Sequence, residues 1–421
     1  MMFEYFPDNY PWSMALQMAL NAGGALSEID ENLRQLKHLA GKNDDMANQA
    51  WHDAWADLGA RNQRLAEDDA SVGRTVSAGQ KYFRSAIYLM TAERMCKSGS
   101  DERLATYNSM LTCFNAGLNY SQSVARRVNV PYRNTHLPAL FYPARTLAGT
   151  ASGKPPPCLV HLDGLDVMKE YLYLAGVPQA YAERGVSTLL LDHPGIGEAL
   201  RLGNLKLTPE TEEPTAAAVD YLETTGDVDP SRIGVAGISL GGYYAPRAAG
   251  FEPRIKCVVA WGAINDYGEI TRRRLDGTGT SLSVSHWEEH MNWVLGTSSR
   301  EGILDVTSRM SLEKALPNIR CPFLILHGES DRQIPFHMAQ KTLDAAINSP
   351  LAELKVFTSE TGGVEHCQVD NAQIAVEYMA DWVAEAFNLY TVTAMTPTSD
   401  IGGSRNHLSP VGKWPKKKWP P

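Results

Sequence analysis

The sequence lacks the features of a membrane-spanning, secreted or nucleic-acid-binding protein. It has no apolar run of about 18 residues that could cross a bilayer. Residues 1–12 carry acids and prolines and no basic segment before an apolar run, so we expect no secretory signal. Basic residues are in deficit, with 39 Lys and Arg against 48 Asp and Glu and a net charge of -9. Since nucleic-acid binders carry a basic patch, we expect neither a nucleic acid nor a membrane as partner.

Cysteine is also sparse, and its spacing excludes the usual metal motifs. The six cysteines show no Cys-x-x-Cys pair, which is typical of buried or free thiols in a reducing compartment. We therefore expect a cytoplasmic protein with no metal and no cofactor. The segment from His286 to His290 has two histidines but not the order His-Glu-x-x-His, so we interpret it as a polar helix face. The cysteines are Cys96, Cys113, Cys158, Cys257, Cys321 and Cys367.

The first part of the chain predicts a separate helical domain. At 421 residues the chain exceeds one ordinary core, so we expect a main domain with an addition. Residues 11–125 have few glycines and no β-branched runs, and Trp51 and Trp55 lie one helical turn apart. We predict a helical N-terminal domain over residues 1–125, with these aromatics in its core. At the other end, residues 390–421 are predicted to form an extended tail.

From residue 126 the pattern becomes that of an α/β domain, which we place at residues 126–389. Residues 127–133 and 137–145 are predicted to form a hairpin around a loop at 134–136. Short apolar runs then alternate with helical segments, as in a doubly wound, mostly parallel sheet that is covered on both faces. Residues 263–317 interrupt the alternation and are too long for a loop, so we predict an inserted lid over the active site. The apolar runs are 158–162, 186–191, 233–237, 255–261, 322–326 and 354–357.

The strongest motif predicts a nucleophilic serine. The segment Gly237-Ile-Ser239-Leu-Gly241 matches Gly-x-Ser-x-Gly and lies between an apolar strand and a helical run, the context that this motif needs. Glycines carry no Cβ, so strand and helix can approach closely around a serine that is held in a strained turn. The helix N-terminus favours a developing negative charge. Ser239 is therefore the predicted nucleophile.

A serine nucleophile needs a base and an acid, and later segments supply candidates for both. Asp331 follows a late apolar run and is the predicted acid, while Asp344 is a weaker candidate because it lies inside an apparent helix. Among 11 histidines, His366 follows the last predicted strand. The resulting order of Ser239, Asp331 and His366 is the one that α/β-hydrolases use. We therefore predict the α/β-hydrolase fold with this catalytic triad.

Two backbone amides are predicted to form the oxyanion hole. One is the N–H of Leu240, directly after the nucleophile. The second is expected from the loop after residues 158–162, where we favour Gly164 or Leu165. The segment 192–197, Asp-His-Pro-Gly-Ile-Gly, ends another strand at the same edge, and we interpret it as shaping the loop rather than taking part in catalysis.

Several segments together resemble the 2,6-dihydropseudooxynicotine hydrolase family and its fungal relatives. The fungal members include hydrolases that shorten heptaketides in pigment pathways, and hydrolases of the fusarin and cytochalasan type. The similarity spans nearly the whole chain, including the helical front. The segments are Phe6-Pro-Asp-Asn-Tyr10, Leu162-Asp-Gly-Leu-Asp166 with Lys169-Glu170, Asp192-His-Pro-Gly-Ile-Gly197, Gly237-Ile-Ser-Leu-Gly-Gly-Tyr-Tyr244, Val259-Ala-Trp-Gly262, those around Asp331 and His366, and Trp414-Pro.

The resemblance implies a small-molecule substrate with an activated carbonyl, an ester or a β-dicarbonyl, in the biosynthesis of a mycotoxin or pigment. The nicotine-degrading relative cleaves a C–C bond with the help of an extra glutamate after the Trp-Gly strand. Glu269 is the nearest counterpart in this sequence, and Asp266 is a rival. The resemblance also suggests that the helical front is a homodimer contact, whereas the residues alone allow it equally to wall the substrate pocket.

Three hypotheses for the function remain open on the sequence. The first is a serine hydrolase of a polyketide-derived small molecule. The second is an acyltransferase or cyclase, in which a substrate hydroxyl or amine replaces water on the same triad. The third is a non-catalytic small-molecule-binding protein, since a fold does not fix a function.

Overall fold

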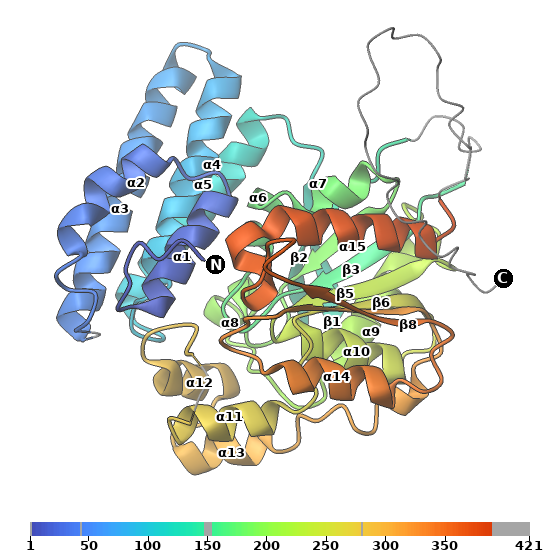
Figure 1. The fold of residues 1–421 in the computed structure, drawn as a ribbon. Helices are drawn as coiled ribbons and strands as arrows, with labels where there is room; N and C mark the ends of the chain where they lie inside the picture. Colours follow the sequence, from blue (N-terminus) through green and yellow to red (C-terminus); the bar gives the residue numbers. More distant parts are fainter. Residues whose placement is uncertain (1, 43, 147–153, 279–280, 390–421) are drawn as a thin grey trace, which may run out of the picture.

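A computed structural model describes residues 2–42, 44–146, 154–278 and 281–389 of the chain. The predicted tail at 390–421 lies outside the described residues. Five α-helices precede the first strand, and an eight-stranded sheet follows with helices on both faces (Figure 1). None of the described helices is both long and apolar enough to cross a membrane.

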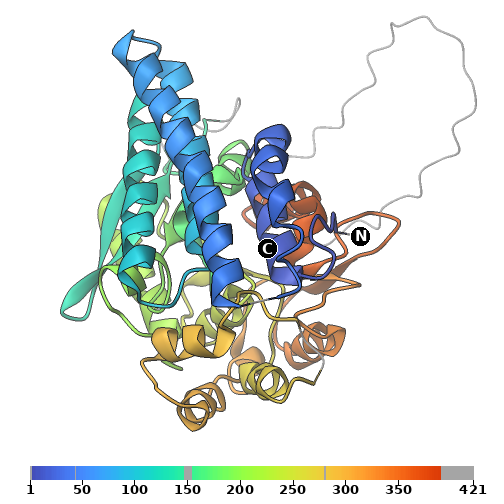
Figure 2. The same ribbon diagram turned by 90° about the vertical axis from the view of Figure 1, so that its left-hand side faces the viewer.

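The helical front is built around three long helices that run side by side (Figure 2). Asp44 and Ser100 are the N-cap residues of two of these helices, and the side chain of each accepts a hydrogen bond from a backbone amide of the first turn. Trp12, Trp51 and Trp55 are buried in the core. The ring centroid of Trp51 lies 5.4 Å from that of Trp55 and 4.8 Å from that of Trp12, which confirms the predicted core packing of Trp51 and Trp55. The helices are α1 (Tyr10–Asn21), α2 (Leu26–Leu33), α3 (Asp45–Ser71), α4 (Thr75–Glu93) and α5 (Asp101–Tyr120), with a 3₁₀ turn at Arg34–Leu36.

The sheet has the order β1-β2-β4-β3-β5-β6-β7-β8. Strand β2 runs antiparallel to both of its neighbours, and the strands from β3 to β8 are parallel. This confirms the predicted doubly wound, mostly parallel sheet. The strands are β1 (Arg126–Tyr132), β2 (Thr135–Tyr142), β3 (Cys158–Leu162), β4 (Ser187–Leu191), β5 (Ile233–Ile238), β6 (Ile255–Trp261), β7 (Phe323–Gly328) and β8 (Ala352–Phe357).

The hairpin at the start of the sheet is tighter than predicted. Tyr132 pairs with Thr135, so the loop is Arg133-Asn134 instead of residues 134–136. Arg133 has φ of +50°, and a positive φ is what a two-residue hairpin turn requires. Thr135 and His136 therefore belong to the strand ladder and not to the loop.

Two apolar layers cover the sheet. Alternate side chains of each buried strand enter opposite layers, as Leu189 and Leu190 of β4 do. The first layer lies under α6, α7 and α15 and joins the core of the helical front, and the second lies under α9, α10 and α14 (Figure 1). The bounds are α6 (Lys169–Leu174), α7 (Val177–Ala182), α8 (Gly197–Arg201), α9 (Glu212–Thr225), α10 (Gly241–Phe251), α14 (Phe336–Ala345) and α15 (Ala372–Ala386).

The insertion between β6 and β7 packs against the helical front. It contains α11 (Tyr267–Leu275), α12 (Trp287–Leu295) and α13 (Arg300–Thr307), and a 3₁₀ turn (Leu316–Asn318) leads on to β7. Glu289 accepts a hydrogen bond of 3.0 Å from the Ser98 amide. His290 is buried and faces Arg103, so the prediction of a polar helix face is wrong for this residue, because α12 is packed between two parts of the protein.

Candidate active site

The tight turn at Ser239 joins β5 to α10. Ser239 has φ of +56°, and its amide donates a hydrogen bond of 2.8 Å to the carbonyl of Trp261. A Cβ on Gly237 would lie 2.1 Å from the carbonyl oxygen of Gly241, and a Cβ on Gly241 would lie 2.7 Å from the carbonyl oxygen of Asp163. Only glycine fits at both positions, so the strand and the helix can meet around a strained serine.

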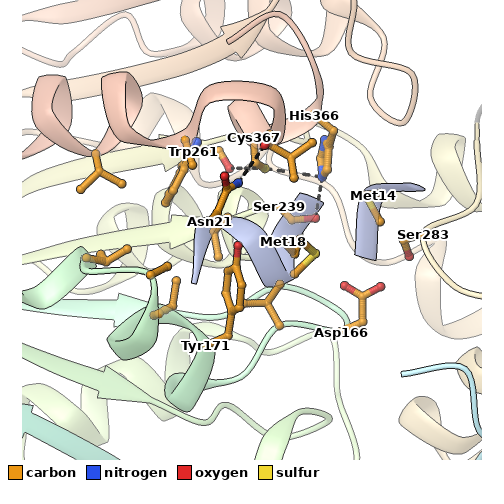
Figure 3. A pocket seen from close by; sticks show the side chains of 18 of the residues that line it. Met14, Met18, Asn21, Asp166, Tyr171, Ser239, Trp261, Ser283, His366 and Cys367 are labelled. Atoms are coloured by element: carbon orange, nitrogen blue, oxygen red, sulfur yellow. Dashed lines mark hydrogen bonds between the residues drawn. The ribbon is translucent and has the colours of Figure 1, made fainter. Parts of the chain in front are cut away.

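The structure brings the three predicted residues Ser239, His366 and Asp331 together. His366 Nε2 lies 2.9 Å from Ser239 Oγ, and His366 Nδ1 lies 2.8 Å from Asp331 Oδ2 (Figure 3 shows the first two residues). The other oxygen of Asp331 accepts hydrogen bonds from the amides of Gln333 and Ile334, at 2.8 Å and 2.9 Å. The turn after β7 therefore fixes the carboxylate, which in turn orients the imidazole.

The charges of His366 and Asp331 support each other. Burial disfavours the imidazolium, but the Asp331 carboxylate outweighs this effect and raises the pKa of His366 well above its usual range. Burial also opposes ionisation of Asp331, and the adjacent His366 nevertheless lowers the pKa of that carboxyl. The pair is therefore suited to holding a proton taken from Ser239.

The loop after β3 lies directly against the serine. A Cβ on Gly164 would lie 3.0 Å from Ser239 Cβ and 3.5 Å from Ser239 Oγ. Leu240 immediately precedes the first turn of α10. The carbonyl of Leu165 faces the other way, with His290 Nε2 at 3.5 Å. Of the two loop residues that the sequence suggested, Gly164 is the one in close contact with Ser239.

A cavity of about 110 Å³ opens at Ser239 and is mostly apolar. Helix α1 contributes Met14, Met18 and Asn21 to its wall, and Tyr171 and Trp261 line it from the α/β domain (Figure 3). Asn21 also donates a hydrogen bond of 2.8 Å to the carbonyl of Val369, three residues after His366, and so ties α1 to the histidine segment. The helical front thus provides one wall of the cavity.

A buried ion pair forms the polar part of the cavity wall. Arg94 donates at 3.0 Å to both the carboxylate and the carbonyl of Asp166, and at 3.2 Å to the carbonyl of Ser283. Burial opposes ionisation of Asp166, but the Arg94 guanidinium lowers the pKa of that carboxyl. Sequence analysis assigned no role to either side chain. Asp166 ends the predicted oxyanion loop, whereas Arg94 follows α4 without any motif around it.

The cavity wall also carries a thiol beside the histidine. Cys367 Sγ lies 3.5 Å from His366 Nε2 and 3.4 Å from the carbonyl oxygen of Trp261. The indole of Trp261 donates a hydrogen bond of 2.7 Å to Gln368. All six cysteines are buried and free, as the sequence predicted.

Two predicted acids lie away from the cavity. Glu269 accepts from His337 Nε2 at 3.0 Å and lies 3.7 Å from Arg273, so its partners are on the surface of α11 and α14. Asp266 caps α11 by accepting from the Glu269 amide at 2.9 Å. Neither Glu269 nor Asp266 is among the described residues that line the cavity, whereas the acidic residue Asp166 is. The proposal of an accessory role for Glu269 or Asp266 therefore has no support in the geometry.

The insertion covers less of the cavity than the predicted lid would. Among its described residues only Ser283 lines the cavity. The apolar side chains of its helices, such as Ile270 and Met291, join the core on the opposite face of the sheet, and this packing holds the insertion at the edge of the site. Helix α1 takes the covering position instead.

One group of potential metal ligands lies elsewhere, in the helical front. The ligand atoms of His52, Cys96 and Glu102 are within 4.8 Å of one another. Gln49 donates to Glu102 at 2.9 Å, and Thr106 bonds His52 at 3.0 Å. None of the three residues lines the Ser239 cavity among the described residues.

Comparisons with known proteins place the chain in a family. The profile of the prolyl oligopeptidase family matches residues 176–389, and that of the FrsA-like esterases matches residues 44–267. Hydrolase acrC of Aspergillus aculeatus is 25% identical over 92% of this chain and 99% of its own length. The 20-hydroxy-prefusarin hydrolase of Gibberella moniliformis is 30% identical, over 68% of this chain and 75% of the relative. The 2,6-dihydropseudooxynicotine hydrolase of Paenarthrobacter nicotinovorans is 26% identical, over 82% and 87%.

A solved structure shares the fold. The crystal structure of 2,6-dihydroxy-pseudo-oxynicotine hydrolase has a TM-score of 0.69 at 23% identity, and covers 88% of this chain and 95% of the solved chain. The family membership supports an enzyme over the hypothesis of a protein with no catalytic activity. The chain is therefore an enzyme of the α/β-hydrolase superfamily, related to 2,6-dihydropseudooxynicotine hydrolase and to fungal hydrolases, and it belongs to the prolyl oligopeptidase family.

Proposed function

We propose that this enzyme is a serine hydrolase of a polyketide-derived small molecule in secondary metabolism, and that Ser239 attacks an ester or a β-dicarbonyl carbonyl. The main support is the pair of hydrogen bonds that link Ser239 to His366 and His366 to Asp331. Ser239 and His366 line the cavity. A polyketide pathway is consistent with the fungal relatives, one of which is named for 20-hydroxy-prefusarin.

The triad geometry supports a two-step acyl transfer. His366 Nε2 takes the proton of Ser239 Oγ as the oxygen bonds to the substrate carbonyl. We assign the amides of Leu240 and Gly164 to the oxyanion of the tetrahedral intermediate, because both residues adjoin Ser239. His366 then gives its proton to the leaving group, and the acyl group stays on Ser239. Water, deprotonated by the same imidazole, releases the acid and restores the serine.

The same residues serve either bond type. With an ester the leaving group is an alkoxide, which the His366 imidazolium protonates to the alcohol. With a β-dicarbonyl the C–C bond breaks, and the electron pair leaves as an enolate that takes the same proton to become a ketone. Both reactions consume one water molecule and yield a carboxylic acid.

The cavity lining indicates the shape of the substrate. Met14, Met18 and Trp261 provide apolar and polarisable contacts, which suit a hydrocarbon or conjugated chain. Asp166 is an ionised acceptor, so it suits a substrate hydroxyl rather than a substrate anion. We therefore propose a largely apolar substrate that carries a hydroxyl or enol group away from the reacting carbonyl.

Ring closure on the same triad is a second candidate function. Asp166 and Ser239 line the same cavity. A substrate hydroxyl bound to Asp166 would therefore be positioned to attack the acyl group on Ser239 in place of water. Release of a lactone instead of an open hydroxy acid would distinguish this cyclase from a hydrolase.

A panel of substrates tests the proposal. We expect wild type to turn over apolar esters or β-diketones, and Ser239→Ala to lose that activity. Ser109→Ala is the matched control, because Ser109 is exposed on α5, bonds only within its own helix and does not line the cavity, so this variant should retain turnover. Equal activity of Ser239→Ala and wild type would contradict the proposal, and mass spectrometry of the products separates acid, ketone and lactone.

Three other expectations remain predictions: a cytoplasmic location, the absence of a cofactor and a homodimer. Sedimentation velocity of the full chain tests the dimer directly, with a single species of about twice the chain mass as the expected result.

A further inference from the structure

A sealed cluster of ionisable side chains lies under the loop that carries Gly164. Asp163, Lys169, Glu170 and Asp192 have no exposed surface. Lys169 Nζ lies 2.6 Å from Asp192, 2.8 Å from Glu170 and 2.9 Å from Glu198. The ammonium donates hydrogen bonds to Asp192 and Glu198, and its contact with Glu170 is an ion pair without a hydrogen bond.

The cluster leaves Asp163 without a donor. Arg127, at the rim, pairs with Glu198 and lies 3.6 Å from Glu170. Neither oxygen of Asp163 accepts a hydrogen bond from any described residue. Four carboxyl groups therefore face two cations, and the one that reaches neither cation is completely buried. An ionised carboxylate in that position is strongly disfavoured, because it has lost its hydration and has no hydrogen bond or ion pair to compensate for that loss.

The Asp192 carboxylate is the natural acceptor for a proton on Asp163. Asp192 accepts from the Lys169 amide at 3.2 Å and the Glu198 amide at 2.8 Å, in addition to the ammonium of Lys169. These donors hold Asp192 in place and in its charged form. A Cβ on Gly197 would lie 2.2 Å from the same carboxylate, so the segment 192–197 is folded tightly around it.

We propose that Asp163 is held protonated, donates its O–H to Asp192, and through this bond positions the amide of Gly164 against Ser239. This positioning role rests on the proposed serine mechanism, whereas the protonation itself does not. Burial and the Asp192 carboxylate both raise the pKa of Asp163 well above its usual range. Burial opposes ionisation of Asp192, but Lys169 lowers its pKa.

The backbone connects this bond to the reacting oxygen. Asp163 follows the last residue of β3, and its carbonyl packs against Gly241 at the start of α10. The next residue, Gly164, touches Ser239. A shift of Asp163 therefore moves Gly164 relative to Ser239. The distance between the Gly164 amide and the oxyanion formed at Ser239 determines how strongly that oxyanion is stabilised.

The surroundings show which groups respond when pH changes. Asp192 faces Asp163 from the end of β4, while Lys169 and Glu170 of α6 and Tyr244 of α10 interact with it electrostatically. Lys169 keeps its charge because burial, which opposes it, is outweighed by Asp192, Glu170 and Glu198, which raise its pKa. Deprotonation of Asp163 would add a second negative charge beside Asp192, so we expect the loop to lose this bond at high pH.

Two variants of Asp163 test the proposal. Asp163→Asn keeps a neutral donor of similar shape, whereas Asp163→Ala removes the donor. We expect the Asn variant to retain kcat near the wild-type value, and the Ala variant to lose roughly 10²-fold in kcat with a smaller change in KM. The Ala variant should also lose affinity for a boronate transition-state analogue more than for a substrate-like ketone. Equal kcat in all three proteins would overturn the positioning role.

Infrared difference spectra test the protonation without relying on activity. Wild type minus Asp163→Asn should show the carbonyl stretch of a protonated carboxylic acid, which an ionised carboxylate lacks. If the spectrum shows an ionised carboxylate at neutral pH, or if the Asn variant loses as much kcat as the Ala variant, the proposal is wrong. If instead Ser239→Ala kept full turnover, the serine mechanism would fail while the infrared band remained.

Discussion

The guanidinium of Arg94 lies 3.0 Å from the carboxylate of Asp166, and this ion pair joins the helical front to the loop beside the nucleophile. Arg94 directly follows α4, and Asp166 lies two residues after Gly164. Both side chains line the Ser239 cavity. The helical front is therefore part of the catalytic cavity as well as an addition to the α/β domain.

Removing one partner of this pair should destabilise the protein. Arg94→Ala leaves the Asp166 carboxylate, whose side chain is 8% exposed, without its cationic partner, which typically costs about 3–5 kcal/mol. The double variant Arg94→Ala/Asp166→Asn should recover part of that loss, because the remaining amide is neutral. Urea unfolding monitored by circular dichroism measures both changes. Equal stability of the single and double variants would show that the two charges are not coupled.

The pH dependence of activity follows from His366. The imidazole acts as a base only when it is neutral, and the Asp331 carboxylate raises its pKa well above 6.5 despite burial. We therefore expect kcat/KM to increase with pH through a midpoint above 6.5. Asp331→Asn removes the charge that holds the proton, so its midpoint should move to lower pH and its kcat should fall by about 10⁴-fold. A wild-type midpoint below 6.5 would argue against this assignment.

A methyl group on Gly164 should impair catalysis more than folding. The added Cβ would meet Ser239 Cβ at 3.0 Å and the Ile238 carbonyl at 3.1 Å, so the loop must shift by a few tenths of an ångström. We expect Gly164→Ala to lower kcat by roughly 10²-fold, as loss of an oxyanion donor does. Gly41→Ala is the control, since its Cβ meets only Asp8, at 3.8 Å. Steady-state kinetics of both variants measures the effect. An unchanged kcat in Gly164→Ala would show that this loop does not contribute to the oxyanion hole.

Filling the cavity from α1 should separate large from small substrates. Met18→Trp adds volume at the cavity wall, so KM should increase for long apolar esters while short esters remain substrates. Met46→Trp is a matched control, because Met46 is 60% exposed and is not among the residues that line the cavity. If both variants discriminate substrates alike, α1 does not form the acyl-binding wall.

The proton on Asp163 predicts a pH-dependent difference in stability. The folded state keeps this proton above the ordinary aspartate pKa of 3.8, whereas the unfolded state releases it, so this group makes the folded state less stable as pH increases. Asp163→Asn has no such proton. Its stability relative to wild type should therefore grow with pH above 3.8 by up to about 1.4 kcal/mol per pH unit. Urea unfolding at several pH values measures the slope, and a constant difference would mean that Asp163 ionises normally.

The fold and the position of Ser239 were predictable because their signals are local. The short apolar runs identify the parallel strands, and the two glycines around Ser239 are required by contacts within the same turn. The proximity of Asp331 and His366 followed from chain order, since parallel strands end at one edge of the sheet.

The expectations that the geometry does not support depended on how distant segments pack. Glu269 was chosen because it follows the Trp-Gly strand, yet α11 directs it toward His337. The apolar side chains of the predicted lid join the core on the opposite face of the sheet, and α1 lines the cavity in its place. Arg94 has no motif, so only the tertiary structure reveals that it reaches Asp166.

Active-site labelling tests the central claim, that Ser239 is the nucleophile, most directly. Incubation with a fluorophosphonate and mass spectrometry of the digested protein should place one adduct on Ser239 in wild type and in Ser283→Ala. Ser239→Ala should carry no adduct, and His366→Ala should react far more slowly because the base is missing. An adduct on another residue, or equal labelling of Ser239→Ala and wild type, would contradict the account.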